Sequence, residues 1–397
     1  MFRLIFCFLF YLTVISLPSP TQAYVSFLTT EQIETVKTKT QSDLDAKKAM
    51  LLLMRQADRA VAQPTQIPLG YGGLAQDYFC PDQSTMLNYN EKTGIHYCPV
   101  DNKQYSGEKF DAAQRFYAHM KNSRTLKDLG LAYALTGDNK YAAAGRIIML
   151  QYAKNWPAYN NPNSQKDHGH LFWQLSDEAQ FATNLAWGYN LIYPALTASE
   201  QQSIETGLLR PLYTNLQAHK TDTISANRTW ENAASCLLGF AIDNPEWYKA
   251  AIEGSLGMEE QIDKGLSDAG LWLESPLANH YAALSALTAV AEIAHRYHYD
   301  LTSSLKMKAM FTLPLTLPNS SEQPTKIQAA DLYELAYAWY KEPLYANYLR
   351  SIYNNPAIKI DRLSYRALFY GLPLPALAAA PQSIVPLQPA SQTTETK

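Results

Sequence analysis

The strongest constraint on the fold is a succession of helix-length apolar segments that starts near residue 109 and continues almost to the end of the chain. Apolar residues recur in these segments at helical spacing, and the connections between them are rich in Gly, Pro, Asn or Asp. Strand-like alternation is scarce. The expected helices are 29–62, 109–122, 124–136, 138–155, 175–192, 199–218, 227–242, 245–265, 280–297, 304–312, 328–340 and 343–353.

Consecutive helices joined by short loops form either an open solenoid or a closed ring of helical hairpins. The chain shows no fixed-period consensus of the tetratricopeptide kind, which disfavours a regular solenoid. Residues 64–107 are the irregular part of the pattern. We therefore expect an all-α array of hairpins with one irregular hairpin near the N-terminus.

The first 23 residues have the pattern of a secretory signal peptide. Arg3 precedes an apolar run from Leu4 to Leu17, and the segment ends on the small residue Ala23. The run is too short to span a bilayer comfortably, and no later stretch approaches that length. Cleavage after Ala23 is expected to give a periplasmic or secreted protein without a membrane segment.

The 397 residues can form one large domain or two ordinary ones, and an apolar content of 47% is ample for a core. With a net charge of -3, the protein as a whole does not attract nucleic acid or anionic membranes. An acidic ligand must therefore bind where Lys or Arg side chains gather locally. The 27 Tyr and 7 Trp pack in a core or line a sugar-binding cleft. We expect a monomer with one domain over residues 24–375 and a disordered tail at 376–397.

Three cysteines follow the signal segment. Cys80 and Cys98 flank the irregular hairpin and can close it by a disulfide in an oxidising compartment. Cys236 stands among apolar residues of an expected helix and is predicted to be a buried thiol.

The first of three polar stretches is "KDHGHLFWQLSDEAQF". It contains His168, His170, Trp173, Gln174, Asp177 and Glu178. The two acidic residues suit the positive end of a helix dipole, and that is their whole role in the simplest interpretation. The aromatic and amide pair is harder to explain by helix formation alone. The two histidines are not spaced i, i+4, so a zinc site is not expected.

The second stretch is "TISANRTWENAASCLLGFAI", at the start of an apolar helix. Asn227, Trp230 and Glu231 share one face of its first turn, where free N–H groups favour an anion. In the alternative interpretation, Ser225 or Asn227 caps the helix and the indole belongs to the core.

The third stretch, "DAGLWLESPLANHYAALSAL", is a loop with Trp272 and Glu274 that leads into a helix beginning near Asn279. His280 lies close to the N-terminus of that helix, where a neutral imidazole is favoured. A lone histidine is more often structural, but here Tyr281, an amide and a carboxylate lie beside it. The chain lacks a nucleophile elbow, a phosphate loop and the zinc signatures, so no cofactor or metal is expected.

These stretches, together with "FCPDQSTMLNYNEKTGIHYCPVDNKQYSGEKF", resemble in order the helical domain of heparinase II/III-like and alginate lyase-like polysaccharide lyases. The resemblance covers roughly residues 75–345. It implies an incomplete (α/α) toroid with a long cleft, which cuts an acidic polysaccharide of uronic acids by β-elimination.

The resemblance also implies roles for particular side chains. Such an enzyme neutralises the uronate carboxylate, removes the proton on C5 and returns a proton to O4. Asn227 or Arg228 would neutralise the carboxylate, Tyr281 would be base, acid or both, and His280 would orient it or share the proton transfer. The expected substrate-binding residues are His170, Trp173, Gln174, Trp230, Glu231 and Glu274.

The chain departs from the family pattern at three positions of the second and third stretches. When Trp230 is used as the anchor, Ala226 stands at the usual Asn and Asn227 at the usual His. The family's Tyr-His pair falls on Asn279 and His280. Many relatives carry paired Cys-Pro-x-Cys motifs that bind zinc, and Gln83 and Asp101 stand where the second cysteine of each motif would be. This favours the Cys80 to Cys98 bridge over a zinc site. In size the chain is closer to the toroid-only alginate lyases than to relatives with a β-sandwich.

Three other functions remain open from the sequence. The substitutions at the family positions suit a glycan-binding or degenerate toroid without turnover. A hydrolase on a similar toroid would need two carboxylates flanking the bond, and Glu231 and Glu274 are the only plausible pair. A purely structural helical scaffold would lack an aromatic-lined cleft.

Overall fold

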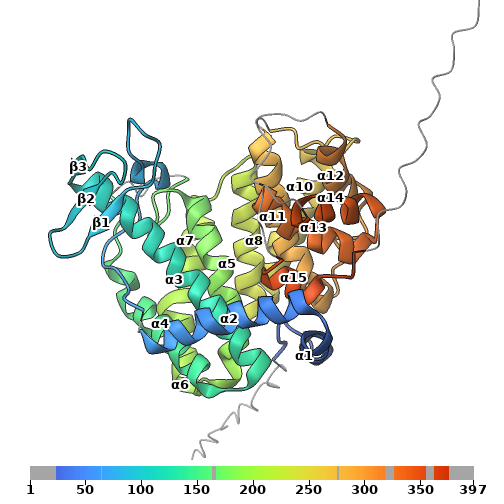
Figure 1. The fold of residues 1–397 in the computed structure, drawn as a ribbon, viewed down its shortest axis with the longest axis horizontal. Coiled ribbons are helices and arrows are strands. Elements are labelled where there is room, and N and C mark those ends of the chain that lie inside the picture. Colours follow the sequence, from blue (N-terminus) through green and yellow to red (C-terminus); the bar gives the residue numbers. More distant parts are fainter. Residues whose placement is uncertain are drawn as a thin grey trace, which may run out of the picture.

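The computed structural model describes residues 24–63, 65–162, 167–274, 277–317, 326–354 and 362–374. The expected signal peptide and the expected disordered tail lie outside these residues. Within them the protein is mostly helical, and its helices form an incomplete (α/α) toroid (Figure 1). The all-α prediction is therefore confirmed, and a partial ring of hairpins replaces the solenoid alternative.

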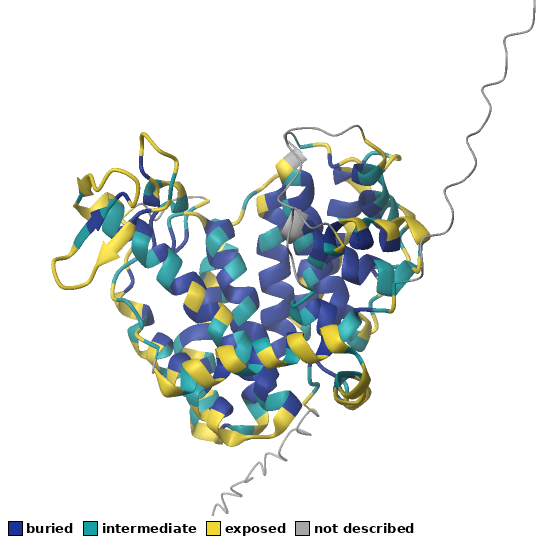
Figure 2. Ribbon diagram, viewed as in Figure 1, coloured by how far each residue is buried: buried dark blue, intermediate teal, exposed yellow. Residues whose placement is uncertain are grey.

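Four inner helices pack side by side in chain order: α3 (Glu108–Thr136), α5 (Leu175–Ile192), α8 (Ala226–Ala241) and α11 (Leu277–Ala294). Most residues of α5 and α8 are buried (Figure 2), because each of these helices is enclosed by neighbours on both sides and by an outer layer. The outer helices are α4 (Asn139–Asn155), α6 (Ala198–Ile204), α7 (Arg210–His219), α9 (Pro245–Glu253) and α10 (Met258–Gly265).

The inner helices α3 and α5 approach one another closely through glycines. A Cβ added at Gly188 would lie 2.4 Å from Cγ of Leu126, and one added at Gly130 would lie 3.0 Å from Cβ of Leu191. These small residues set the separation of the two helices, since any side chain at the crossing would push them apart.

Replacing Gly188 by Ala is expected to lower the free energy of unfolding. The methyl group overpacks the α3–α5 contact, which typically costs about 1–3 kcal/mol and exceeds the gain of roughly 1 kcal/mol in helix propensity. Denaturant-induced unfolding measures the difference. Gly145→Ala is the matched control, since its nearest neighbours are side-chain ends at 3.3 Å. Equal stability of the two variants would contradict the packing argument.

The N-terminal helices α1 (Thr30–Ser42) and α2 (Leu44–Ala62) tie the first inner helix to the end of the chain. Helix α2 packs on α3 at one side and on α15 (Tyr365–Tyr370) at the other (Figure 1). The C-terminal layer also contains α12 (Leu305–Thr316), α13 (Lys326–Tyr340) and α14 (Pro343–Tyr353). Helix α2 thus spans the gap in the incomplete ring.

Some predicted boundaries were wrong for identifiable reasons. The expected helix 29–62 is broken at Asp43, whose carboxylate accepts hydrogen bonds from the backbone N–H groups of Asp45 and Ala46 and caps α2. The two helices expected at 109–122 and 124–136 are one continuous helix. The helix expected at 199–218 contains a π-helical turn at Glu205–Leu209, ahead of Pro211, which has no backbone N–H.

The irregular hairpin forms a small lobe beside the start of α3. Its strands β1 (Asn88–Asn90), β2 (Ile95–Tyr97) and β3 (Gln104–Tyr105) form an antiparallel sheet in the order β1-β2-β3. The predicted disulfide between Cys80 and Cys98 is present and lies in a separate small core. Cys236 is a free, buried thiol, as predicted.

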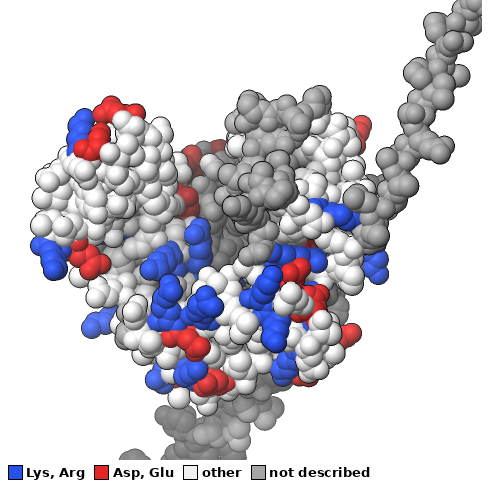
Figure 3. Space-filling view, viewed as in Figure 1, with Lys and Arg blue, Asp and Glu red and all other residues white. Residues whose placement is uncertain are grey.

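The outer surface is hollowed beside this lobe, above α2 (Figure 3). Among the described helices, none combines the length and apolar character that a membrane span requires.

Candidate active site at the mouth of the inner helices

The three polar stretches meet at the N-terminal ends of α5, α8 and α11. We call this surface the mouth, and define it by the loops 167–174, 220–225 and 266–274, residues 70–73 and the first turns of α8 and α11. The backbone N–H of Ala226 donates to Oε2 of Glu274 at 2.7 Å, which joins the second stretch to the third. Thr221 Oγ1 lies 3.0 Å from Oδ1 of Asp167, which joins the first stretch to the second. Segments far apart in the sequence therefore form one surface.

An aromatic group lines the first part of the mouth. The Trp173 ring is partly exposed and lies 5.7 Å from the His168 ring and 6.4 Å from the Tyr71 ring, between centroids. The backbone N–H of Trp173 donates to the carbonyl of Gly72 at 2.8 Å, which fixes the loop against the segment 70–73. Gln174 is exposed beside it. Such a group offers faces on which a sugar ring can stack.

Tyr71 is a residue that the sequence analysis missed. Its segment reads "PLGYGG", and the glycines are required by close packing: a Cβ at Gly73 would lie 2.8 Å from Cβ of Ala112 on α3. Arg115 also holds this segment on α3, because its Nε donates to the carbonyl of Tyr71 at 3.0 Å. The sequence did contain an indication of this residue, because a tyrosine between glycines is typical of an aromatic side chain at the surface of a tightly packed loop.

Glu178 anchors the loop that carries these aromatics. Its Oε2 accepts hydrogen bonds from the backbone N–H groups of Leu171 at 2.6 Å and Phe172 at 3.3 Å, and Oε1 accepts from Nδ2 of Asn215 at 2.7 Å. The side chain is fully buried, and burial raises its pKa to about 7. Its function is therefore to hold the loop backbone, which goes beyond the helix-dipole role considered from the sequence. Burial also raises the pKa of Asp177 to about 7.

Glu231 near the start of α8 holds a loop in a similar way. It is buried, and its two oxygens lie 2.8 Å from the backbone N and from Oγ1 of Thr221. Burial raises the pKa of Glu231 to about 7, and the nearby charge of Asp167 acts in the same direction. The Thr221 hydroxyl has one proton but lies within hydrogen-bond distance of both carboxyl groups. A protonated Glu231 fits this geometry, because it can donate to Thr221 while Thr221 donates to Asp167.

The stability of the protein is expected to depend on this proton. Between the ordinary glutamate pKa of about 4.5 and the folded value of about 7, the folded protein keeps a proton that the unfolded chain loses. The contribution of Glu231 to stability is therefore present at low pH and declines as pH rises through that window. Glu231→Gln is expected to remove this part of the pH dependence, because the amide can replace the protonated carboxyl. Urea unfolding at pH 5 and pH 7.5 measures it, with the exposed Glu259→Gln as control; a profile equal to that of the wild type would contradict the assignment.

The remaining predicted residues of the second stretch differ in exposure. Ser225 is the N-cap of α8, since its Oγ accepts from the backbone N–H of Arg228 at 3.1 Å. The capping alternative thus applies to Ser225, and Asn227 is left exposed at the mouth beside the partly exposed Trp230. Glu274 is also partly exposed. Because Glu231 is buried with both oxygens bonded, it does not form a pair with Glu274 that could flank a glycosidic bond.

Arg228 does not face solvent. Its guanidinium donates to the backbone carbonyls of Thr221, Ser255 and Leu256 at 3.3–3.4 Å, and only 5% of the residue is exposed. This geometry ties the loop before α8 to the connection between α9 and α10. The structure thus gives Arg228 a structural role, which differs from the carboxylate contact that its residue type suggested.

His280 is likewise buried, with no exposed surface. Its Nδ1 accepts from the backbone N–H of Trp272 at 3.2 Å, and Nε2 donates to the carbonyl of Met310 at 2.9 Å. Burial lowers the pKa of His280 to about 4, so the ring is neutral as predicted, although desolvation is the main cause. Neither nitrogen is presented to a substrate. The ring instead packs edge-on against Tyr281 at 5.5 Å between centroids, an arrangement that suits an orienting role.

Tyr281 lies in the second turn of α11 and is 8% exposed. Burial raises the pKa of its hydroxyl, and a hydrogen bond with Tyr333 of α13 partly opposes this shift. Its phenol therefore keeps its proton at neutral pH. Asn279 beside it is partly exposed.

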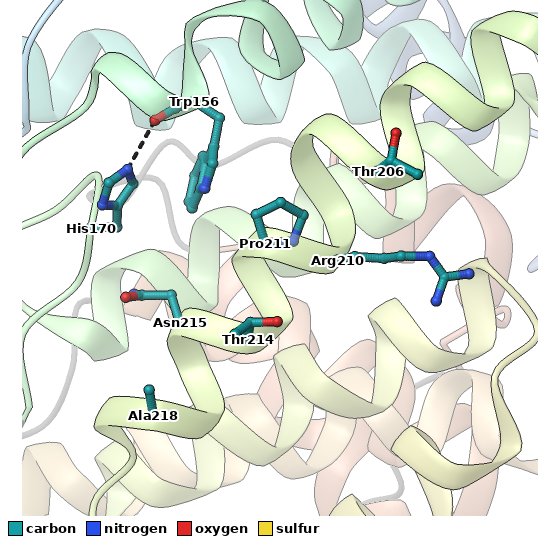
Figure 4. Close-up of a pocket in the computed structure, with 8 residues that line it drawn as sticks. All are labelled: Trp156, His170, Thr206, Arg210, Pro211, Thr214, Asn215 and Ala218. Atoms are coloured by element: carbon teal, nitrogen blue, oxygen red, sulfur yellow. Dashed lines mark hydrogen bonds between the residues drawn. The ribbon is translucent and has the colours of Figure 1, made fainter.

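His170 faces a different space from the other predicted residues. Its Nε2 donates to the carbonyl of Trp156 at 2.9 Å, at the edge of a cavity of about 510 Å³ between the end of α4, the loop 167–174 and α7 (Figure 4). The cavity is lined by Trp156, His170, Thr206, Arg210, Pro211, Thr214, Asn215 and Ala218. The structure thus separates His170 from the aromatic group at the mouth. In the described part of the chain, no group of three or more His, Cys, Asp or Glu residues could hold a metal ion.

Comparisons with known proteins agree on one family. A sequence model of the alginate lyase family matches residues 36–320. An exo-oligoalginate lyase of Saccharophagus degradans is 28% identical over 208 residues, covering 49% of this chain and 28% of that protein. An alginate lyase of Stenotrophomonas maltophilia is 31% identical over 243 residues, covering 57% of this chain and 32% of that protein. The chain thus aligns with about a third of the length of these curated relatives.

A comparison with solved structures bears on the fold. The crystal structure of an alginate lyase from Bacteroides ovatus matches 89% of this chain and 100% of its own, with a TM-score of 0.63 and 15% sequence identity. At this identity the match shows a shared fold. The resemblance to alginate lyase-like polysaccharide lyases is confirmed by the family model, which covers well over half of the sequence. The chain belongs to the alginate lyase family.

Proposed function

We propose that this protein is a polysaccharide lyase that cleaves a uronic-acid polysaccharide, alginate in the first place, by β-elimination. The family match over residues 36–320 carries the proposal, since both curated relatives are named for action on alginate or its oligomers. The mouth supports it, because it combines partly exposed aromatic rings with the exposed amides of Gln174 and Asn227.

The reaction needs three contributions from the chain. The carboxylate beside C5 must be neutralised so that the C5 proton can leave, and we assign this contact to the exposed amide of Asn227. A base then takes the C5 proton, a C4=C5 double bond forms and the C4–O4 bond breaks. A proton must finally reach O4, the leaving oxygen. We propose Tyr281 as acid, base or both, with His280 orienting its ring.

The buried polar residues support these groups indirectly. Glu178 fixes the loop of Trp173, and Glu231 and Arg228 fix the loop before α8. Trp272 Nε1 donates to Oε2 of Glu274 at 3.2 Å, which continues the hydrogen bonds from His280 to the start of α8. We propose that Trp173, Gln174, Trp230 and Glu274 contact the sugar rings on either side of the cut bond.

Incubation with a panel of polymers tests the proposal. Alginate, heparin-type, hyaluronan and pectic substrates are each incubated with the protein, and the ultraviolet absorbance of the unsaturated uronate product is followed. We expect a rise with alginate. Absence of an unsaturated product from every member of the panel would contradict lyase activity.

A second function, glycan binding without turnover, is favoured by one observation. Both nitrogens of His280 and the guanidinium of Arg228 are bonded to backbone groups inside the protein. A protein that binds alginate but never yields an unsaturated product would belong to this class.

We also propose that the protein is exported, as residues 1–23 indicate. The Cys80–Cys98 disulfide supports this location, because such bonds persist in oxidising compartments.

A further inference from the structure

A group of exposed cations lies outside the mouth, on helices α2 and α3. We call it the basic band and define it as Lys47, Arg55, Arg59, Lys121 and Arg124, all of which are exposed. Figure 3 shows Lys and Arg side chains gathered over α2 and the middle of α3, below the hollow beside the hairpin lobe. The band stands out because the chain as a whole carries a net charge of -3.

The helices present these cations together for a simple geometric reason. The buried face of α2 is formed by Ala46, Ala49, Leu53 and Ala57, so Arg55 and Arg59, spaced i, i+4, project from the opposite side. Lys121 and Arg124 are spaced i, i+3 on α3, against which α2 packs.

Within the part of the chain that the structure describes, the cations of the band form no ion pairs. Among the described residues, no carboxylate lies within 4.0 Å of any of the five. The acidic residues nearby have other partners: Asp45 lies 4.0 Å from Lys48, and Asp58 lies 3.0 Å from Lys140. Asp128 interacts with both Lys127 and Arg124 and offsets part of the positive charge at one end of the band. The remaining cations can therefore attract an anionic ligand.

The band is close enough to the mouth for a linear polymer to reach both. Helix α3 begins beside the segment 70–73, because the backbone N–H of Gly73 donates to the carbonyl of Ala112 at 2.7 Å. Lys121 follows Glu108, the first residue of the helix, by thirteen positions, which corresponds to ~20 Å along the axis.

We propose that the basic band binds the part of an acidic polysaccharide that extends beyond the mouth. This inference rests on the proposed function and adds a second contact region for the same substrate. A polyuronate carries a carboxylate on each ring, so several weak contacts with Lys and Arg act together on one chain. Once the polymer is held at the band, its ring at the mouth is present at a high effective concentration. A short oligomer gains nothing from the band.

The test compares a polymer with a trisaccharide. The band variant replaces Arg55, Arg59, Lys121 and Arg124 by Gln; the control variant replaces Lys92, Lys154, Lys249 and Lys264 by Gln and has the same net charge. We expect the KM for polymeric alginate to rise on the order of tenfold in the band variant at low ionic strength. The KM for a uronate trisaccharide should stay within about twofold, and the difference for the polymer should vanish at about 1 M salt.

Equal behaviour of the band and control variants toward the polymer would overturn the inference, as would an equal rise in KM for polymer and trisaccharide. Affinity electrophoresis of both variants in gels containing alginate measures binding without turnover, so it decides the question even if no lyase activity is found. Vesicles containing anionic lipid test the other class of partner. Loss of vesicle binding in the band variant with unchanged alginate binding would overturn the assignment of the band to a polysaccharide.

Discussion

Replacing Tyr281 with Phe is expected to lower turnover on polymeric alginate by roughly 10²- to 10⁴-fold, the range for loss of an acid or base group. The substitution removes one hydroxyl and little volume, so the packing of the ring against His280 and the binding of substrate should be kept. The raised pKa of Tyr281 supports a phenol that holds its proton until O4 departs. Single-turnover kinetics with a confirmed substrate measure the effect separately from binding.

The matched control for this prediction is Tyr297→Phe. It deletes a hydroxyl that donates to the carbonyl of Phe240 at 2.9 Å, away from the mouth. Unchanged elimination in Tyr281→Phe would show that another group transfers the proton. The hydroxyl of Tyr333, which is hydrogen-bonded with Tyr281, would then be the next to replace.

Replacing Asn227 with Ala is expected to lower kcat on the order of 10²-fold, the typical cost of one lost donor to developing charge. Its amide is exposed on the first turn of α8, and the cap of that helix is Ser225. Because the amide does not cap the helix, its loss should leave the thermal midpoint of unfolding nearly unchanged.

The control for Asn227→Ala is Asn139→Ala, which removes an exposed amide from the first turn of α4. The KM, the kcat and the melting temperature are measured for both variants and compared. A fall in melting temperature that parallels the fall in kcat would mean that Asn227 acts through stability and not through the substrate.

Much of the fold could be predicted because helical periodicity is a local property. Helix α5 has the expected limits, 175–192, since its apolar residues recur without a break between two polar loops. Helix α3 was predicted as two pieces that divide at Ser123, beside the polar residue Asn122. In the structure both are buried, and Asn122 donates to the carbonyl of Gln66 and lies near the hydroxyl of Tyr152. Partners so distant in sequence leave no local signal.

The candidate site, too, could be predicted only in part. The sequence placed Asn227, Arg228 and His280 near helix starts, and they are there. It could not indicate which side chains turn inward. The burial of Arg228 depends on carbonyls of Ser255 and Leu256, and that of His280 on the carbonyl of Met310, some thirty residues away in each case. Position along a helix follows from the pattern, whereas the direction of a side chain depends on the neighbouring elements.

The way in which α2 spans the gap in the ring has a consequence for the order of folding. Tyr24 donates to the carbonyl of Asn190, and Nζ of Lys39 donates to the carbonyl of Ala367 at 3.2 Å. The first helices to be synthesised therefore find their last partners only after more than three hundred further residues are available. Contacts of such long sequence separation slow folding, because the chain between them must be ordered first. Helices α1 and α2 should thus dock late, and a chain that is still being translated would remain open along this seam.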